Sequence, residues 1–203
     1  MISIFYNKNG LNDICIIKIL SNNKKDITKT NTIINKESII NFVDGEIESV
    51  AISNVSKKIQ LPEGYLKWNQ KIANFVKSET GYDLNKFNEK NFIVGKIKKS
   101  SLIPNTHLNL CEVLVNNNDC LQIVCGAKNA TINSLVVISM VNNIMPNGLI
   151  IKKSKLQSHD SCGMLCSKKE LFNLEEESEG IIHLEEKEIG TEYLEHYANY
   201  KDL

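Results

Sequence analysis

Short runs of apolar residues alternate with polar turns along most of the chain, a pattern that indicates β-strands more than long helices. Near the start, ISIFY (2–6) and DICIIKI (13–19) flank the turn NKNGLN. We expect these two runs to form a hairpin or a pair of adjacent strands. Further strand-like runs lie at 32–34 and 50–53.

One segment of the first part has helical periodicity instead. After Pro62 and Glu63, five apolar residues fall on one helical face: Tyr65, Trp68, Ile72, Phe75 and Val76. Gly81 offers a stop for this helix, and Trp68 is most simply the anchor of a core. The short polar run 83–91 is the best candidate for the junction between two domains. We therefore predict a small α/β domain of the α+β class over 1–90, with its role left open.

After the junction the chain changes to regularly spaced β runs, at 92–97, 110–115, 121–125, 135–141 and 149–153. Strands at roughly ten-residue spacing, joined by Gly and Asn turns, indicate a small closed barrel, and an OB-fold is the natural candidate. Ser167 and Glu170 predict a capped short helix over 167–172, and 180–184 is expected to return as a strand. Residues 91–203 are thus predicted to form an all-β OB-fold barrel with an acidic C-terminal extension.

Charge is neutral overall but unevenly distributed. Residues 1–90 hold 13 lysines against 10 acids, residues 91–170 hold 9 against 4, and residues 171–203 hold 2 against 10. The predicted barrel is therefore the basic part and the end of the chain the acidic part. All 24 basic side chains are lysine, so the residue best suited to bidentate phosphate or guanine recognition is missing. An ATP-using synthetase core would be expected to contain arginine, so this composition argues against such a core.

Candidate chemistry for catalysis or metal binding is sparse. The closest cysteine pairs, Cys120/Cys125 and Cys162/Cys166, lack zinc-knuckle spacing, and reduced thiols are expected. The chain has no Walker loop or GxGxxG, and no histidine adjoins a recognisable nucleophile motif. Polar residues interrupt the first apolar run, so we expect no signal or membrane span and a cytoplasmic location. We expect no catalytic residue, metal or cofactor.

Residues from about 92 to 193 resemble a known module. The match rests on VGKI (94–97), PNTHLNLCEV (104–113), LQIVCGAKN (121–129), MPNGLIIKKSKL (145–156), SCGMLCSKKELF (161–172) and EGIIHLEEKEIGTEY (179–193). These phrases resemble the tRNA-binding domain of the bacterial phenylalanyl-tRNA synthetase β subunit. With an N-terminal domain of about 90 residues and no synthetase core, the layout resembles the free-standing YtpR family.

Four positions depart from the family pattern. Ile103 stands where a histidine usually precedes Pro104, and a single His107 stands before Leu108 where the family usually has an Asp–Lys pair. Gln157 stands where an arginine often follows the lysine phrase, and Ser158 where a glycine is common. Each departure weakens the expected grip on phosphate.

Two sets of residues are the candidate RNA site. In an OB-fold a basic groove tracks the nucleic-acid backbone, and strand alternation puts Lys96 and Lys98 on one face with Lys99 opposite, and Lys153 with Lys155. A solvated lysine-rich surface is the alternative for these residues. We also expect His107 to contact RNA. The resemblance implies that Asn129, Ser161, Gly163 and Met164 line the RNA site. Without it, core packing for Met164 and a tight turn for Gly163 would be the simpler explanations.

The sequence therefore predicts a non-catalytic tRNA-binding protein that uses an OB-fold surface. The alternative is a protein-interaction module of the translation machinery, with the barrel as scaffold and the acidic tail docking a partner. A homodimer or a translation-factor partner is compatible with both. An enzyme acting through the first domain is a third and weaker hypothesis, because it rests only on unassigned residues.

Overall fold

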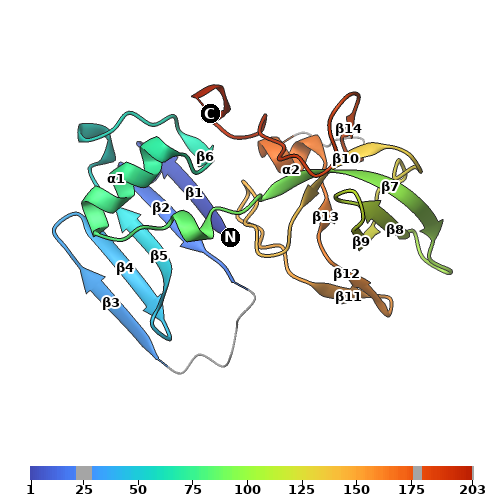
Figure 1. Ribbon diagram of the computed structural model, residues 1–203, viewed down its shortest axis with the longest axis horizontal. Helices are drawn as coiled ribbons and strands as arrows, with labels where there is room; N and C mark the ends of the chain where they lie inside the picture. Colours follow the sequence, from blue (N-terminus) through green and yellow to red (C-terminus); the bar gives the residue numbers. More distant parts are fainter. Residues whose placement is uncertain (22–28, 176–179, 203) are drawn as a thin grey trace. The chain divides into compact units, whose positions relative to one another are not determined.

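The computed structural model describes residues 1–21, 29–175 and 180–202, and strands make up most of its regular structure (Figure 1). It divides into two compact units. Unit 1 comprises Met1–Glu89 and Leu194–Leu203, and unit 2 comprises Lys90–Tyr193. The chain therefore leaves unit 1 once, builds unit 2 and returns.

Unit 1 is built on one antiparallel sheet in the order β3-β4-β5-β2-β1-β6. Its strands are β1 (Ile2–Asn7), β2 (Ile14–Ile19), β3 (Thr30–Ile34), β4 (Ser38–Val43), β5 (Glu46–Ile52) and β6 (Gly64–Leu66). The predicted hairpin is confirmed, since β1 pairs antiparallel with β2. Short 3₁₀ turns lie at η1 (Val55–Lys57), η2 (Asn85–Phe87) and η3 (Tyr200–Asp202). Because strands dominate unit 1, its predicted α+β class stays a prediction.

The helix of unit 1, α1 (Gln70–Thr80), lies against one face of the sheet (Figure 1) and starts later than the sequence predicted. Asn69 caps it, because its side-chain oxygen accepts a hydrogen bond from the Ile72 backbone N–H at 2.9 Å. Gly81 ends the helix as predicted, with φ of +79°. Tyr65 belongs to strand β6 instead, so the start predicted near Pro62 was wrong.

The last residues of the chain complete unit 1. The ring of Tyr197 stacks on that of Tyr65 with 5.2 Å between centroids, and the Ala198 N–H donates to the Tyr65 carbonyl at 2.9 Å. Asn199 forms two side-chain hydrogen bonds with the backbone of Lys67, at 2.8 and 2.9 Å. The predicted second domain, 91–203, therefore ends ten residues earlier in the structure, because this segment packs on β6.

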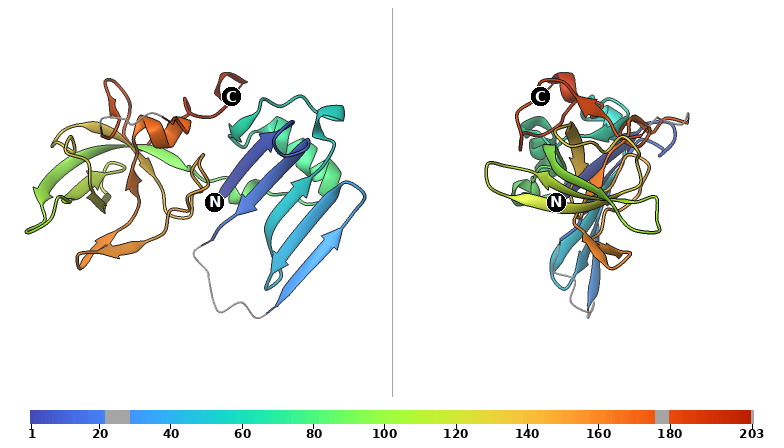
Figure 2. Two further views of the ribbon diagram at one scale, coloured as in Figure 1. Left: turned by 180° about the vertical axis from the view of Figure 1, so that it is seen from behind. Right: turned by 90° about the vertical axis from the view of Figure 1, so that its right-hand side faces the viewer.

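Unit 2 contains a curled antiparallel sheet in the order β13-β10-β7-β8-β9. The strands of unit 2 are β7 (Phe92–Leu102), β8 (Asn109–Leu114), β9 (Cys120–Cys125), β10 (Leu135–Ser139), β11 (Ser154–Leu156), β12 (His159–Ser161), β13 (Met164–Leu165) and β14 (His183–Leu184). The two ends of the sheet approach each other, because β13 and β12 also contact β9, and the curl can be followed in Figure 2. This arrangement is OB-like.

Two local features of unit 2 differ from the sequence prediction. The register between β7 and β8 shifts between Ile97 and Lys99, so Lys98 is an extra residue at a β-bulge. Simple alternation along this strand fails there. The run predicted as a strand at 149–153 forms only an isolated bridge between Ile144 and Ile150, and the hairpin β11–β12 follows instead.

The predicted helix cap in unit 2 is confirmed. Helix α2 (Lys168–Phe172) begins after Ser167, whose hydroxyl accepts from the Glu170 N–H at 3.3 Å. The Glu170 carboxylate in turn accepts from the Ser167 backbone N–H at 2.7 Å. The return predicted over 180–184 is a bridge between Ser167 and Ile181 followed by β14. Part of the acidic run 175–179 lies outside the described residues.

Candidate nucleic-acid interface

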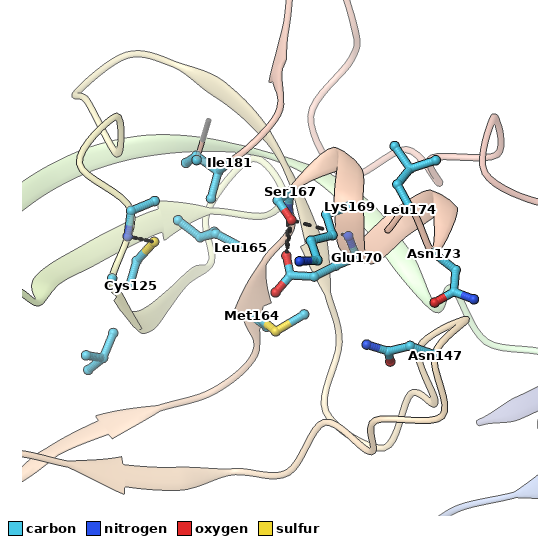
Figure 3. Close-up of a pocket in the computed structure, with 14 residues that line it drawn as sticks. Cys125, Asn147, Met164, Leu165, Ser167, Lys169, Glu170, Asn173, Leu174 and Ile181 are labelled. Atoms are coloured by element: carbon cyan, nitrogen blue, oxygen red, sulfur yellow. Dashed lines mark hydrogen bonds between the residues drawn. The ribbon is translucent and has the colours of Figure 1, made fainter. Parts of the chain in front are cut away.

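Unit 2 carries a hollow of about 620 Å³ between the end of β9, strand β13 and helix α2 (Figure 3). Met164 from β13, Lys169 and Asn173 from the α2 segment, and Asn147 from the loop after β10 contribute to its lining. In Figure 3, Asn147 and Asn173 lie on the same side of the hollow, with Met164 between them and Cys125. The hollow is thus walled by four separate parts of the chain, since Gly180 and Ile181 also line it.

The chemistry of this lining suits a polar and partly flat ligand. Met164 is half-buried and presents a polarizable thioether. Asn147 and Asn173 are exposed amides that can donate to and accept from base edges or sugars. Lys169 adds a positive charge at the rim. These groups bind and orient a ligand without needing to transfer anything to it.

A second hollow of about 440 Å³ adjoins the first, because both are lined by Gly126, Ala127 and Gly180. Lys128 and Asn129 complete its lining. Gly126 is exposed and has no side chain, so a ligand can approach the backbone closely where the two hollows meet. Together they form one concave surface, which we call the Met164–Lys128 surface.

The cysteines near this surface are poor nucleophiles. Burial raises the pKa of the Cys125 thiol, and burial with the nearby Glu170 charge raises the pKa of Cys166 well above its ordinary value. Both thiols therefore stay protonated near neutral pH, whereas the thiolate is the reactive form. The Glu170 carboxylate accepts hydrogen bonds from both the N–H and the hydroxyl of Ser167, which satisfies it inside the helix cap.

Asn129 has a structural role in unit 2. Its side-chain amide donates to the Ile181 carbonyl at 2.8 Å and accepts from the Ile181 N–H at 3.0 Å. Its own carbonyl lies 2.9 Å from Nε2 of His183. The amide thus holds the returning segment to the loop after β9. Asn129 lines the second hollow, but its hydrogen bonds to Ile181 already use part of the bonding capacity of its side-chain amide.

Ser161 and Gly163 shape the surface from behind. The buried hydroxyl of Ser161 accepts from the Val124 N–H at 3.1 Å and donates to the Gly163 carbonyl at 3.3 Å. Gly163 has φ of +147°, and an added Cβ would lie 3.0 Å from the Ser139 carbonyl oxygen. A tight backbone approach therefore requires glycine there. Of the four family-implied residues, only Met164 presents its side chain to the larger hollow.

The remaining predicted residues lie on other parts of unit 2. Lys96 is half-buried in the middle of β7, whereas Lys98 is exposed at the bulge. Because the bulge interrupts the alternation, the shared face predicted for this pair does not follow from strand geometry. His107 is exposed in the loop between β7 and β8, and its ring is about 4.0 Å from where a Cβ on Gly126 would lie.

Lys153 and Lys155 lie on and beside the hairpin β11–β12. Both are exposed, but only Lys155 is in a strand. The alternation of side chains along a strand therefore does not place the two lysines on one face, as the sequence predicted. The Lys153 ammonium lies 3.9 Å from the Asp160 carboxylate, and Lys155 is the cross-strand neighbour of Asp160. One acid therefore partly offsets two cations on this hairpin.

Sequence reasoning missed four residues of the Met164–Lys128 surface: Lys128, Asn147, Lys169 and Asn173. Lys128 and Lys169 lie inside the phrases VCGAKN and SCGMLCSKKELF, so proximity to those motifs was the available signal. Asn147 lies inside the phrase MPNGLIIKKSKL and so carried the same signal, whereas Asn173 directly follows the phrase that ends at Phe172.

Over residues 1–21, 29–175 and 180–202, no cluster of His, Cys, Asp and Glu is suited to hold a metal ion. Within the same ranges, no helix has the length and apolar character needed to cross a membrane.

Comparison with known proteins gives one family and several relatives. Residues 92–192 match the family model described as "Putative tRNA binding domain". An uncharacterized protein of Mycoplasma genitalium is 31% identical over 207 residues, which covers 98% of this chain and 90% of that protein. An uncharacterized Mycoplasma pneumoniae protein is 39% identical over 131 residues, 64% of this chain and 56% of that protein.

A third relative is much longer than this chain. The phenylalanine–tRNA ligase beta subunit of Fusobacterium nucleatum is 44% identical over 115 residues. The match covers 56% of this chain but only 14% of the ligase subunit. The similarity to this relative therefore concerns a small part of the ligase subunit.

Proposed function

Because the chain belongs to the tRNA-binding domain family through residues 92–192, we propose that it is a non-catalytic tRNA-binding protein of the YtpR type, acting in translation in the cytoplasm. Unit 2 is proposed to be an OB-fold whose surface holds the RNA. The role of unit 1 is left open in this proposal.

The observation that carries the proposal is the Met164–Lys128 surface inside the matched region. Its thioether, amides and exposed glycine suit an unpaired base or ribose, and its two lysines suit the adjoining phosphates. The raised pKa values of Cys125 and Cys166 support binding over covalent chemistry. No step in this role requires a metal or a cofactor.

Exposed lysines elsewhere on unit 2 would supply the longer-range attraction. Lys98, Lys153 and Lys155 are proposed to contact the RNA backbone, and Lys96 and His107 to border the path between them. Lysine gives point-charge contacts without the bidentate geometry of arginine, so this attraction should depend strongly on salt.

Binding of purified unmodified tRNA, measured by filter retention over a salt series, tests the proposal. About four lysine–phosphate contacts predict a log–log slope of about −3 by the single-strand relation. Lys169→Glu should weaken binding, whereas Lys57→Glu, the same charge change in unit 1, should not. Absence of tRNA binding at low salt, or binding that salt does not weaken, would contradict the proposal.

The protein-interaction alternative is less favoured. It depends on the acidic end of the chain docking a partner, but the final segment of that end belongs to unit 1, where Tyr197 is buried and Asn199 is bonded to Lys67. Pull-down with and without nuclease separates the two functions. Partners that survive nuclease support the alternative, and partners lost with RNA support tRNA binding. A homodimer or a translation-factor partner stays a prediction.

A further inference from the structure

The two edges of the unit 1 sheet are treated differently. At the β6 edge, the Ala198 N–H donates to the Tyr65 carbonyl at 2.9 Å, and the Asn199 side chain bonds to the backbone of Lys67 just beyond the strand. At the other edge, β3 has β4 on its inner side, and no described residue pairs with its outer side. An unpaired strand edge is a template for another strand.

The hydrogen-bond pattern identifies which groups of β3 face outward. The Asn35 N–H donates to the Ser38 carbonyl, and the Asp44 N–H donates to the Lys29 carbonyl, both at 2.8 Å. Bonded residues alternate along an antiparallel strand, so the odd-numbered residues of β3 bond toward β4. The N–H and C=O groups of Thr30, Thr32 and Ile34 therefore point away from the sheet.

The strand itself lacks the features that normally protect an edge. β3 has the sequence TNTII, with no charge, proline or bulge in its pairing with β4. Ile34 is 74% exposed and lies across from Ile39, which is 42% exposed. These two side chains make a small apolar strip beside the outward-facing backbone groups.

The pairing register of β3 and the lysines that flank it, Lys29 and Lys36, favour a second copy of this chain as the occupant. If Thr32 lies opposite Thr32 of the second copy, all five residues of β3 pair and the outward groups meet each other. In that register Thr30 lies opposite Ile34 of the second copy, which covers the exposed isoleucine. Lys29 lies opposite Asn35 of the second copy, whereas a shift by one residue would oppose Lys29 and Lys36.

A hollow on the other face of β3 fits the same arrangement. It has a volume of about 320 Å³ and is lined by Lys29, Asn31, Ile33, Phe42, Gly45 and Tyr82. These residues come from β3, from β4 and its turn, and from the segment after α1. Ile33 of the second copy, opposite Asn31, would lie beside this hollow on the side where the described lining ends.

We propose that unit 1 forms a homodimer by antiparallel pairing of two β3 edges, with the two-fold axis passing between the Thr32 residues. The result is one continuous sheet across both copies, with a closed symmetry that pairs β3 only with itself. The interface is small, so the dimer should be weak and depend on protein concentration. The dimer does not require RNA, so its test is independent of the tRNA-binding proposal.

Light scattering after size-exclusion chromatography of nuclease-treated full chain tests this interface. The wild type should show a mass that rises toward twice that of one chain with concentration. Thr32→Asp and Thr32→Lys should each be monomeric, because like charges face each other on the axis. An equal mixture of the two variants should recover the dimer. Thr131→Asp, an exposed threonine in unit 2, is the control and should dimerise like the wild type.

Circular dichroism of both Thr32 variants should match the wild type, since Thr32 is exposed and its side chain contributes only an exposed hydrogen bond from its hydroxyl to the Asn41 side chain at 2.9 Å. A wild type that stays monomeric at every concentration would overturn the proposal and leave the edge for a strand of another protein. Dimerisation of either variant alone, or failure of the mixture to dimerise, would overturn the two-fold register.

Discussion

The side-chain amide of Asn129 pairs with the backbone of Ile181 as a neighbouring strand would, donating to its carbonyl and accepting from its N–H. The contact joins residues 52 positions apart and fastens the segment before β14 to the loop after β9. Asn129, which the resemblance implies in RNA binding, therefore has a first role in stabilising the fold of unit 2.

Asn129→Asp should destabilise unit 2, because the carboxylate cannot donate to the Ile181 carbonyl. Loss of a partner for a buried polar group costs about 1–3 kcal/mol, and the free energy of unfolding should fall by that order. Hydrogen exchange of unit 2 amides measures it. The unfolding transition seen by fluorescence of Trp68, the single tryptophan and a unit 1 residue, should not move. Equal stability of the variant would contradict this role.

Gly180→Ala should be more damaging than its backbone angle alone implies. Gly180 has φ of +85°, and an added Cβ would lie 2.2 Å from Oδ1 of Asn129. Gly148 has φ of +87° with nothing within 4 Å of such a Cβ, so Gly148→Ala measures the backbone cost alone. That cost is about 1 kcal/mol, and Gly180→Ala should exceed it clearly in thermal unfolding. Equal effects would show that the loop yields without disturbing Asn129.

Ser158→Gly should stabilise the hairpin β11–β12. Gln157 and Ser158 form its turn with φ of +46° and +67°, a region that glycine occupies without strain. Relief of about 1 kcal/mol is expected at this position and should slow hydrogen exchange in the hairpin. Ser154→Gly, in strand β11, should speed exchange instead. The family's common glycine at this position then has a conformational reason.

Acid should weaken unit 1 through His196. Burial, with a smaller effect of the Lys67 charge, lowers the pKa of His196 from 6.5 to about 3. Between these values the unfolded chain binds a proton that the folded chain does not, so stability falls as pH drops below 6.5. From pH 7 to pH 5 the free energy of unfolding of unit 1 should fall by about 2 kcal/mol. Urea unfolding monitored by Trp68 fluorescence measures this loss.

The other three histidines lie in unit 2, and the pKa of Asp13 is lowered, so this pH window isolates His196 within unit 1. His196→Phe should flatten the dependence between pH 7 and pH 5. A variant with the same pH dependence as the wild type would rule out this cause.

Charge reversal at Lys155 should weaken tRNA binding without unfolding unit 2, because the side chain is exposed on an outlying hairpin. Loss of one phosphate contact should reduce the log–log salt slope by about 1. Lys57→Glu in unit 1 is again the control of equal charge. Unchanged affinity of the Lys155 variant would remove this lysine from the proposed site.

The sequence predicted features that depend on neighbouring residues. The β1–β2 hairpin follows from two apolar runs around a polar turn, and the cap of α2 follows from Ser167 and Glu170. The sequence prediction placed the start of α1 too early, near Pro62. The helix begins after Asn69 instead, because the Asn69 side chain caps it. Local pattern therefore sufficed where the stabilising bond spans only a few residues.

Features that depend on distant contacts were not predictable in this way. The bulge at Lys98 arises from the pairing of β7 with β8, and it removes the face that alternation assigned to Lys96 and Lys98. The hydrogen bonds of Asn129 and Ser161 depend on segments far along the chain. The hollow beside Met164 needs α2 and the loop with Asn147 together, and neither run of sequence indicates the other.

The contact of Tyr197 with Tyr65 also makes unit 1 discontinuous in the sequence. Residues that follow unit 2 complete the β6 edge of unit 1, whereas unit 2 occupies the single stretch Lys90–Tyr193. A fragment of residues 1–89 therefore lacks the segment that packs on β6, while a fragment of residues 90–193 contains the whole of unit 2. Dividing the chain at the junction would thus separate unit 2 intact but leave both edges of the unit 1 sheet bare.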